Sequence, residues 1–214
     1  MKATVSALVA AAAVLGAAGT VAAQERLGAI PAAQMTDVQK KVVAEFTKAR
    51  PGGPFGFWWG YLRTPEVLLP FLEIQTYIHT VMESEKGALG EKNTHFAMLI
   101  AARHWTQQVI WDLHDKNAIK AGLKPEILDA LAAGRRPPNM SEDEDIVYDF
   151  CTELQQNHSV SDATYTRMVA KFGERGVAEA TLIQGEYTLM SMFMNVQRTP
   201  LDPGKTPPLK SFPR

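Results

Sequence analysis

The segment THFAMLIAARHWTQQVIWDLHDKNAIKAGL, residues 94–123, carries the pattern from which both the helical class and a candidate site follow. Its apolar residues recur at intervals of three and four, which predicts one helix, a break and a second helix. His95 shares its helix face with Met98, and His114 lies one turn after Trp111. Both imidazoles are therefore expected to point inward, where a buried polar ring must find a partner.

The spacing around His114 resembles the carboxymuconolactone decarboxylase family of the AhpD-like (alkyl hydroperoxidase D-like) superfamily. Its signature opens a helix with C-x-x-C-x-x-x-H or Y-E-W-x-x-H, after an acidic residue on the preceding helix. Anchored on His114, the tryptophan falls on Trp111, the two cysteines fall on Gln107 and Ile110, and the upstream acid falls on His95. The resemblance implies an all-α bundle of about seven or eight helices, in a member that lacks the redox cysteine pair.

The chain divides into three segments. Residues 1–23 contain one lysine, an Ala/Val/Leu-rich run and small residues before the end, the pattern of a secretory signal peptide rather than of an uncleaved anchor. We therefore expect a periplasmic or secreted protein with no membrane contact after cleavage. Residues 24–198 are expected to form one helical domain, and residues 199–214 a proline-rich extended tail over a neighbouring subunit or into solvent.

Charge and cysteine content exclude several classes of function. The formal net charge is −1 and no basic run occurs, so nothing favours nucleic acid or a membrane surface as a partner. Cys151, the single cysteine, is expected in the core, next to Val147 on a helix face. A thiol peroxidase needs a reactive and a resolving cysteine, which Gln107 and Ile110 cannot supply.

Aromatic residues and arginines are the candidates for substrate binding. Residues 55–63, FGFWWGYLR, place Trp58 and Trp59 where they could line a pocket, although the same rings could close the end of the domain or an interface. The guanidinium of Arg63 or Arg103 could hold a carboxylate. Tyr187 on the last helix could point its hydroxyl into the pocket.

The resemblance implies a lyase that acts without a cofactor on a small carboxylated lactone or an aromatic-derived acid. Loss of CO2 leaves an anion that must be protonated on carbon, which requires an acid and donors near the developing negative charge. We assign His114 as the general acid/base and Trp111 as a pocket wall. His95 would orient His114 or relay its proton. Because a second imidazole does not favour imidazolium, His114 is expected to be neutral.

Two alternatives stay open. The histidine pair could hold a metal with a third ligand such as His79, Glu83 or Glu186. The chain could instead be a periplasmic protein that binds a small aromatic acid without turnover. In each case the partner is a small organic acid or lactone, and the resemblance implies a homo-oligomer.

Overall fold

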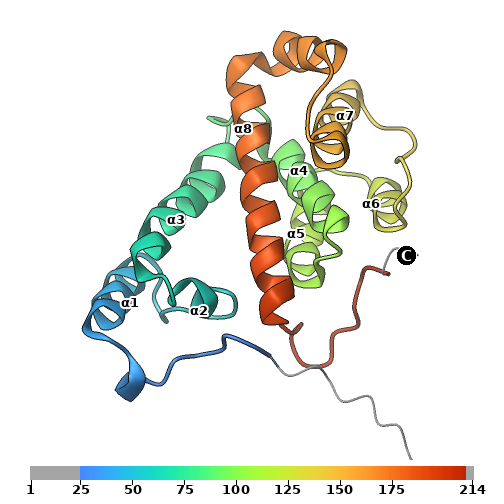
Figure 1. Ribbon diagram of the computed structural model, residues 1–214. Helices are drawn as coiled ribbons and strands as arrows, with labels where there is room; N and C mark the ends of the chain where they lie inside the picture. The colour runs from blue at the N-terminus through green and yellow to red at the C-terminus, as the bar shows by residue number, and fades with distance from the viewer. Residues whose placement is uncertain (1–24, 211–214) are drawn as a thin grey trace, which may run out of the picture.

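The computed structural model describes residues 25–210, so the predicted signal peptide lies outside the described residues. The described chain is helical throughout and contains no strand, which confirms the predicted all-α class. Figure 1 shows the long last helix between two groups, with the first three α-helices on one side and the next four on the other. The elements in chain order are η1 (Ala32–Gln34), α1 (Asp37–Ala49), α2 (Trp58–Tyr61), α3 (Pro65–Tyr77), η2 (Ile78–Met82), α4 (Gly90–His104), α5 (Gln108–Lys120), α6 (Pro125–Ala132), α7 (Glu142–Asn157) and α8 (Asp162–Gln197).

Local sequence signals fix several helix starts. Thr36 begins α1 and Ser141 begins α7, each with a capping box in which the side chain three residues later returns to the cap backbone. Proline in the first turn begins α3 and α6, where its missing N–H costs no hydrogen bond. All four signals are visible in the sequence itself.

Gly173 and Pro70 are two positions at which a helix can be interrupted, and they differ in the structure. Gly173 has φ +68° and ψ 176°, a conformation that glycine adopts readily, so the helical path is interrupted there. A proline inside a helix predicts a kink or a restart, and no restart occurs at Pro70, because α3 continues through it to Tyr77. The chain then passes directly into η2, a π-helical turn.

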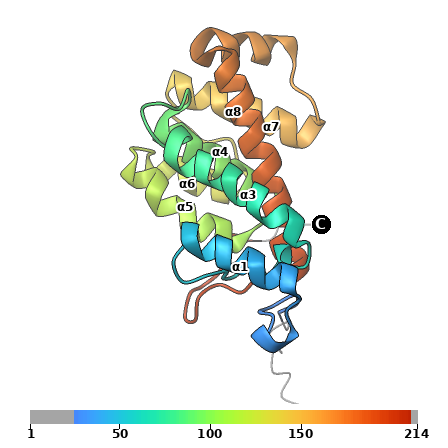
Figure 2. The same ribbon diagram turned by 90° about the vertical axis from the view of Figure 1, so that its left-hand side faces the viewer.

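The helix α4 lies at the centre of the molecule. It packs against α5, α7 and α8, and every residue from 93 to 103 is buried (Figures 1 and 2). Cys151 on α7 is buried in the same core, and burial raises the pKa of its thiol, so the expected core position is confirmed. Polar side chains at residues 93–103 must therefore be satisfied inside the protein.

The described part of the C-terminal tail is attached to its own chain at Leu209, while residues 202–208 are exposed. The side-chain amide of Gln108 donates to the carbonyl of Leu209 and accepts from its N–H, both at 2.8 Å. Leu209 is 4% exposed, and Lys205 pairs with Asp112 and Asp202. No helix among the described residues combines the length and apolarity needed to cross a bilayer.

Candidate functional site

The two histidines of the central helices face each other. Nδ1 of His95, on α4, lies 3.2 Å from Nδ1 of His114, on α5, and the residues are 2% and 7% exposed. A tight turn at residues 105–107 folds α5 back against α4 and brings the rings together. The predicted proximity of the two rings is confirmed.

Tyr187 completes a polar chain from α8. Its hydroxyl lies 3.3 Å from Nε2 of His114, and the tyrosine is fully buried. Burial raises the pKa of Tyr187 well above its usual value, so the phenol keeps its proton. Burial, followed by the charges of His95 and His79, holds the pKa of His114 well below its usual value. Burial lowers the pKa of His95 as well, although Glu83 opposes that shift.

The two neutral imidazoles and the phenol of Tyr187 form a chain of hydrogen bonds in which every donor must point the same way along the chain. When Tyr187 donates to Nε2 of His114, the proton of His114 resides on Nδ1 and is donated to His95. When His95 donates instead, His114 carries its proton on Nε2 and donates to the phenol oxygen. The chain can therefore present either a donor or an acceptor at Tyr187.

A second polar chain reaches the pair from α3 and η2. Gln75, His79 and Glu83 are spaced four residues apart; His79 Nδ1 lies 2.8 Å from Glu83 Oε1, and its Nε2 lies 3.2 Å from Gln75 Oε1. The amide of Gln75 donates to Glu186 at 2.7 Å, and Glu83 Oε1 lies 3.7 Å from His95 Nδ1. The sequence prediction named His79, Glu83 and Glu186 as alternative third metal ligands and did not connect them into a chain. The signal for a chain was the spacing of four residues between Gln75, His79 and Glu83.

A cavity of about 250 Å³ opens beside these chains. Its most distinctive residue is Arg50, at the end of α1, whose guanidinium carbon lies 5.4 Å from the centre of the Trp58 ring. Among residues 25–210, no carboxylate lies within ion-pair distance of Arg50. Sequence reasoning missed this cation. The lining residues are Arg50, Phe55, Phe57, Trp58, Gln75, His79, Leu113, His114, Tyr187 and Met190.

A second cavity of about 480 Å³ adjoins the first and shares Phe55, Phe57 and Leu113 with it. Trp59 lies in its wall, together with residues 199–203 of the tail. Two of the predicted pocket aromatics therefore line cavities, Trp58 the first and Trp59 the second. Trp111 is buried in the core and lines neither of the two cavities, so its predicted place as a pocket wall is not observed.

Arg63 has a different position from the one expected of a substrate ligand. Its guanidinium donates to the carbonyls of Leu27, Gly28 and Trp59 at 3.1, 2.7 and 2.6 Å. The side chain thus attaches residues 25–31, the N-terminal arm, to α2, and it lines neither cavity. The expected role of Arg63 in carboxylate binding was wrong because its acceptors lie in the N-terminal arm, whose position near α2 cannot be deduced from local sequence.

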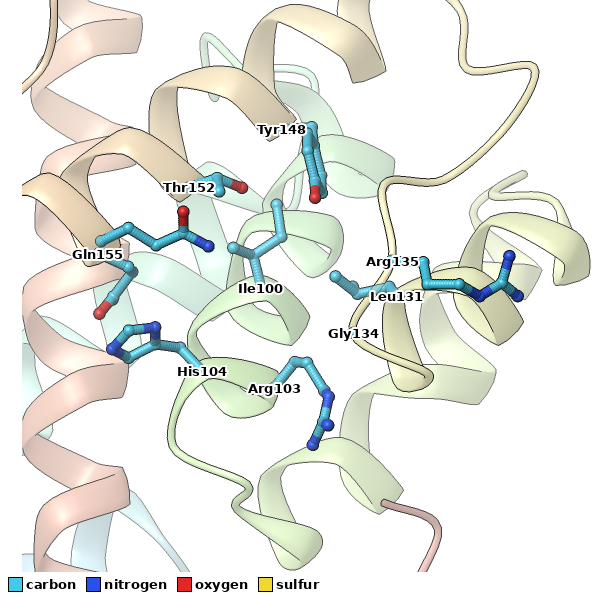
Figure 3. A pocket seen from close by; sticks show the side chains of 10 residues that line it. Ile100, Arg103, His104, Leu131, Gly134, Arg135, Tyr148, Thr152 and Gln155 are labelled. Carbon is cyan, nitrogen blue, oxygen red and sulfur yellow. The ribbon is translucent and has the colours of Figure 1, made fainter. Parts of the chain in front are cut away.

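Arg103 also lies away from the histidines. It lines a small pocket of about 60 Å³ between α4, α6 and α7, with Ile100, His104 and Tyr148 (Figure 3). Its guanidinium donates to the carbonyl of Lys210 at 3.0 Å. The structure therefore separates both predicted arginines from the cavity and places Arg50 there instead.

Comparison with known proteins identifies a solved structure with a similar fold. No family model and no curated protein matches the chain. A solved structure from Agrobacterium tumefaciens is similar, of a protein of unknown function for which the role of antioxidant defence protein AhpD has been suggested. It shares 15% identity over 66% of this chain and 96% of that one, with a TM-score of 0.51. The fold is AhpD-like.

At this identity the likeness concerns the fold and not the chemistry. In this AhpD-like bundle Gln107 is the cap of α5, where its side chain accepts from the N–H of Val109 at 2.7 Å. Ile110 is fully buried in the core. These two positions, which the resemblance equates with a redox cysteine pair, have structural roles here.

Proposed function

We propose that the protein is an enzyme that binds a small carboxylated organic molecule in the cavity of about 250 Å³ and acts on it by proton transfer. The observation that supports this is the shared wall: Arg50, a cation without a carboxylate partner in the described chain, lines the same cavity as His114 and Tyr187. An anion and a proton donor can therefore meet in one apolar enclosure.

Arg50 takes the place proposed earlier for Arg63 or Arg103. A guanidinium matches a carboxylate in shape and charge, and burial makes an unpaired one costly. Burial lowers the pKa of Arg50, while the charge of Tyr187 opposes that shift. A bound carboxylate would relieve this penalty, and the rings of Phe57 and Trp58 suit a flat, unsaturated body.

The proposed reaction is that of a lyase or isomerase. With a carboxylated unsaturated lactone, the C–C bond to the carboxyl group breaks, CO2 leaves and the electron pair moves into the lactone carbonyl. Tyr187 stabilises the resulting anion by donating a hydrogen bond. His114 passes the proton on Nε2 through Tyr187 to carbon, His95 returns a proton to Nδ1 of His114, and water resupplies the one proton that the product gains through the other ring nitrogen of His95.

A substrate screen tests the proposal. Purified protein is incubated with carboxylated lactones, phenylpropanoid acids and related aromatic acids, and turnover is followed by ultraviolet absorbance and CO2 release. Arg50→Met should raise KM at least about tenfold, and Tyr187→Phe should lower kcat about a hundredfold. Arg135→Met, at the exposed rim of the pocket in Figure 3, should change neither.

The same screen identifies the competing function. Binding of an acid without turnover, weakened by Arg50→Met and unaffected by Tyr187→Phe, would replace the enzyme proposal with that of a binding protein. Turnover that persists unchanged in both variants would place the reaction elsewhere in the molecule.

A further inference from the structure

Three side chains behind the cavity place ligand atoms around one point. Nδ1 of His95 lies 3.2 Å from Nδ1 of His114 and 3.7 Å from Oε1 of Glu83. One ligand atom from each of the three residues lies within 4.8 Å of the others. The histidines are buried and Glu83 is partly buried, so a charge between them would be shielded from solvent.

We propose that Glu83, His95 and His114 bind a divalent transition-metal ion, with Zn²⁺ as the reference ion. Ligand bonds of about 2.0–2.2 Å at tetrahedral angles place neighbouring ligand atoms about 3.4 Å apart. The observed separations of 3.2 and 3.7 Å lie on either side of this value. Two imidazoles and one carboxylate are a common donor set for Zn²⁺ and for Fe²⁺.

Hydrogen bonding between the residues explains only part of this geometry. An N–H···N bond accounts for the two imidazoles at 3.2 Å. Oε1 of Glu83 is held by Nδ1 of His79 at 2.8 Å but lies 3.7 Å from His95, so no hydrogen bond joins the carboxylate to the imidazole pair. A shared cation accounts for both separations, because two lone pairs and a carboxylate oxygen then converge on the same positive charge.

The outer contacts suit metal ligands. Histidines that bind metals usually donate their second N–H to an oxygen, and Tyr187 lies at 3.3 Å from Nε2 of His114. A ligating carboxylate is usually hydrogen-bonded as well, and His79 lies 2.8 Å from the ligating oxygen of Glu83. The rings of His79 and His114 are parallel within 1° with centroids 6.0 Å apart.

The metal site goes beyond the proposed acid–base function and uses the same Nδ1 atoms of His95 and His114, so with the ion bound His95 cannot restore the proton of His114. Neither Glu83 nor His95 lines the cavity, so the ion would lie behind His114 and use its Nδ1 face. The Nε2 face of His114 and Tyr187 remain available to the cavity. With the ion bound, His114 carries its proton on Nε2 and can act only as a donor toward Tyr187.

Titration of the purified protein with Zn²⁺ and Co²⁺ tests the site. After treatment with a chelator, the protein should bind one equivalent of Zn²⁺ by calorimetry. X-ray absorption of the zinc-loaded wild type should show two imidazole rings and at least one oxygen ligand. Co²⁺ should give visible absorption bands of low coordination number. These measurements on unmodified protein do not depend on how any variant folds.

Variants then assign the ligands. Glu83→Gln and His95→Asn should each weaken Zn²⁺ binding at least about a hundredfold, whereas His79→Gln, an outer contact, should weaken it about tenfold. His104→Asn is the matched control, because His104 is at the far end of α4, in the pocket of Figure 3, and it should leave affinity unchanged. Circular dichroism verifies the fold of each.

Two outcomes would overturn the proposal. The first is the absence of stoichiometric binding to the wild type. The second is binding that Glu83→Gln and His95→Asn leave intact, which would assign the ion to other residues. The acid–base proposal is judged separately, because Arg50→Met should raise the substrate KM at least about tenfold while leaving Zn²⁺ affinity unchanged.

Discussion

Gln75 and Glu186 are joined by a buried hydrogen bond of 2.7 Å that links α3 to α8 across 111 positions of sequence. The second carboxyl oxygen of Glu186 is buried without a hydrogen-bond partner in the described structure. Burial raises the pKa of Glu186 to about 7, with Gln75 and His79 opposing the shift. The folded protein therefore favours the neutral carboxyl, and deprotonation weakens the fold.

Glu186→Gln should make stability less dependent on pH. Because the folded pKa of about 7 exceeds the usual value of 4.5, the stabilisation associated with the protonated carboxyl is lost as pH rises through about 7. At pH 5 the variant and wild type should differ little, whereas above pH 8 the variant should be more stable by about 3 kcal/mol. Urea unfolding at several pH values measures this.

The matched control for that experiment is Glu66→Gln, an exposed acid in the first turn of α3. It should give a stability difference that does not vary between pH 5 and 8. A Glu186→Gln difference that is equally flat would contradict the assigned effect of burial.

Tyr187→Phe should destabilise the fold by about 1–3 kcal/mol, because it leaves Nε2 of His114 buried without a partner. The substitution removes only a hydroxyl, so packing in the core is preserved. Nitrogen NMR of the imidazoles should show a change in the tautomer of His114 relative to wild type. Unchanged imidazole signals would mean that the phenol does not set the position of the proton.

Arg63→Ala should release the N-terminal arm without unfolding the bundle. Three backbone carbonyls lose their donor, two of them in the arm at Leu27 and Gly28. Limited proteolysis should then cut before α1 much faster than in wild type. The melting temperature of the remaining bundle should change by only a few degrees. Equal cleavage rates would show that other contacts hold the arm.

Gln108→Ala should loosen the C-terminal tail. The substitution removes both hydrogen bonds to the backbone of Leu209, which together contribute about 1–3 kcal/mol. Hydrogen exchange at Leu209 and Lys210 should become faster, while exchange in α4 and α5 stays unchanged. Slow exchange in the variant would assign the attachment to the Lys205–Asp112 pair instead.

Much of the helical framework could be predicted from sequence because its signals are local. The caps at Thr36 and Ser141 and the break at Gly173 each depend on residues within one turn. The meeting of His95 and His114 also follows locally, since a short turn between two helices with inward histidines leaves few other arrangements.

The cation of the cavity could not be predicted in this way. Arg50 reaches the histidines only because α1 packs against α3 and thereby approaches α8, and contacts of that range leave no periodic signal. The predicted role of Arg63 in substrate binding was wrong for the same reason, since two of its acceptors, Leu27 and Gly28, lie 36 and 35 residues earlier in the chain. The path of the tail likewise depends on a contact between Gln108 and Leu209, 101 positions apart.

The π-helical turn Ile78–Met82 makes the position of Glu83 relative to His95 sensitive to the number of residues in the turn. A π turn closes its hydrogen bond over five residues instead of four, so it rotates everything that follows relative to a regular helix. Deletion of one residue within the turn would restore regular α-helical geometry and move Glu83 away from His95. An insertion or deletion at this point would therefore separate Glu83 from His95 without replacing either residue.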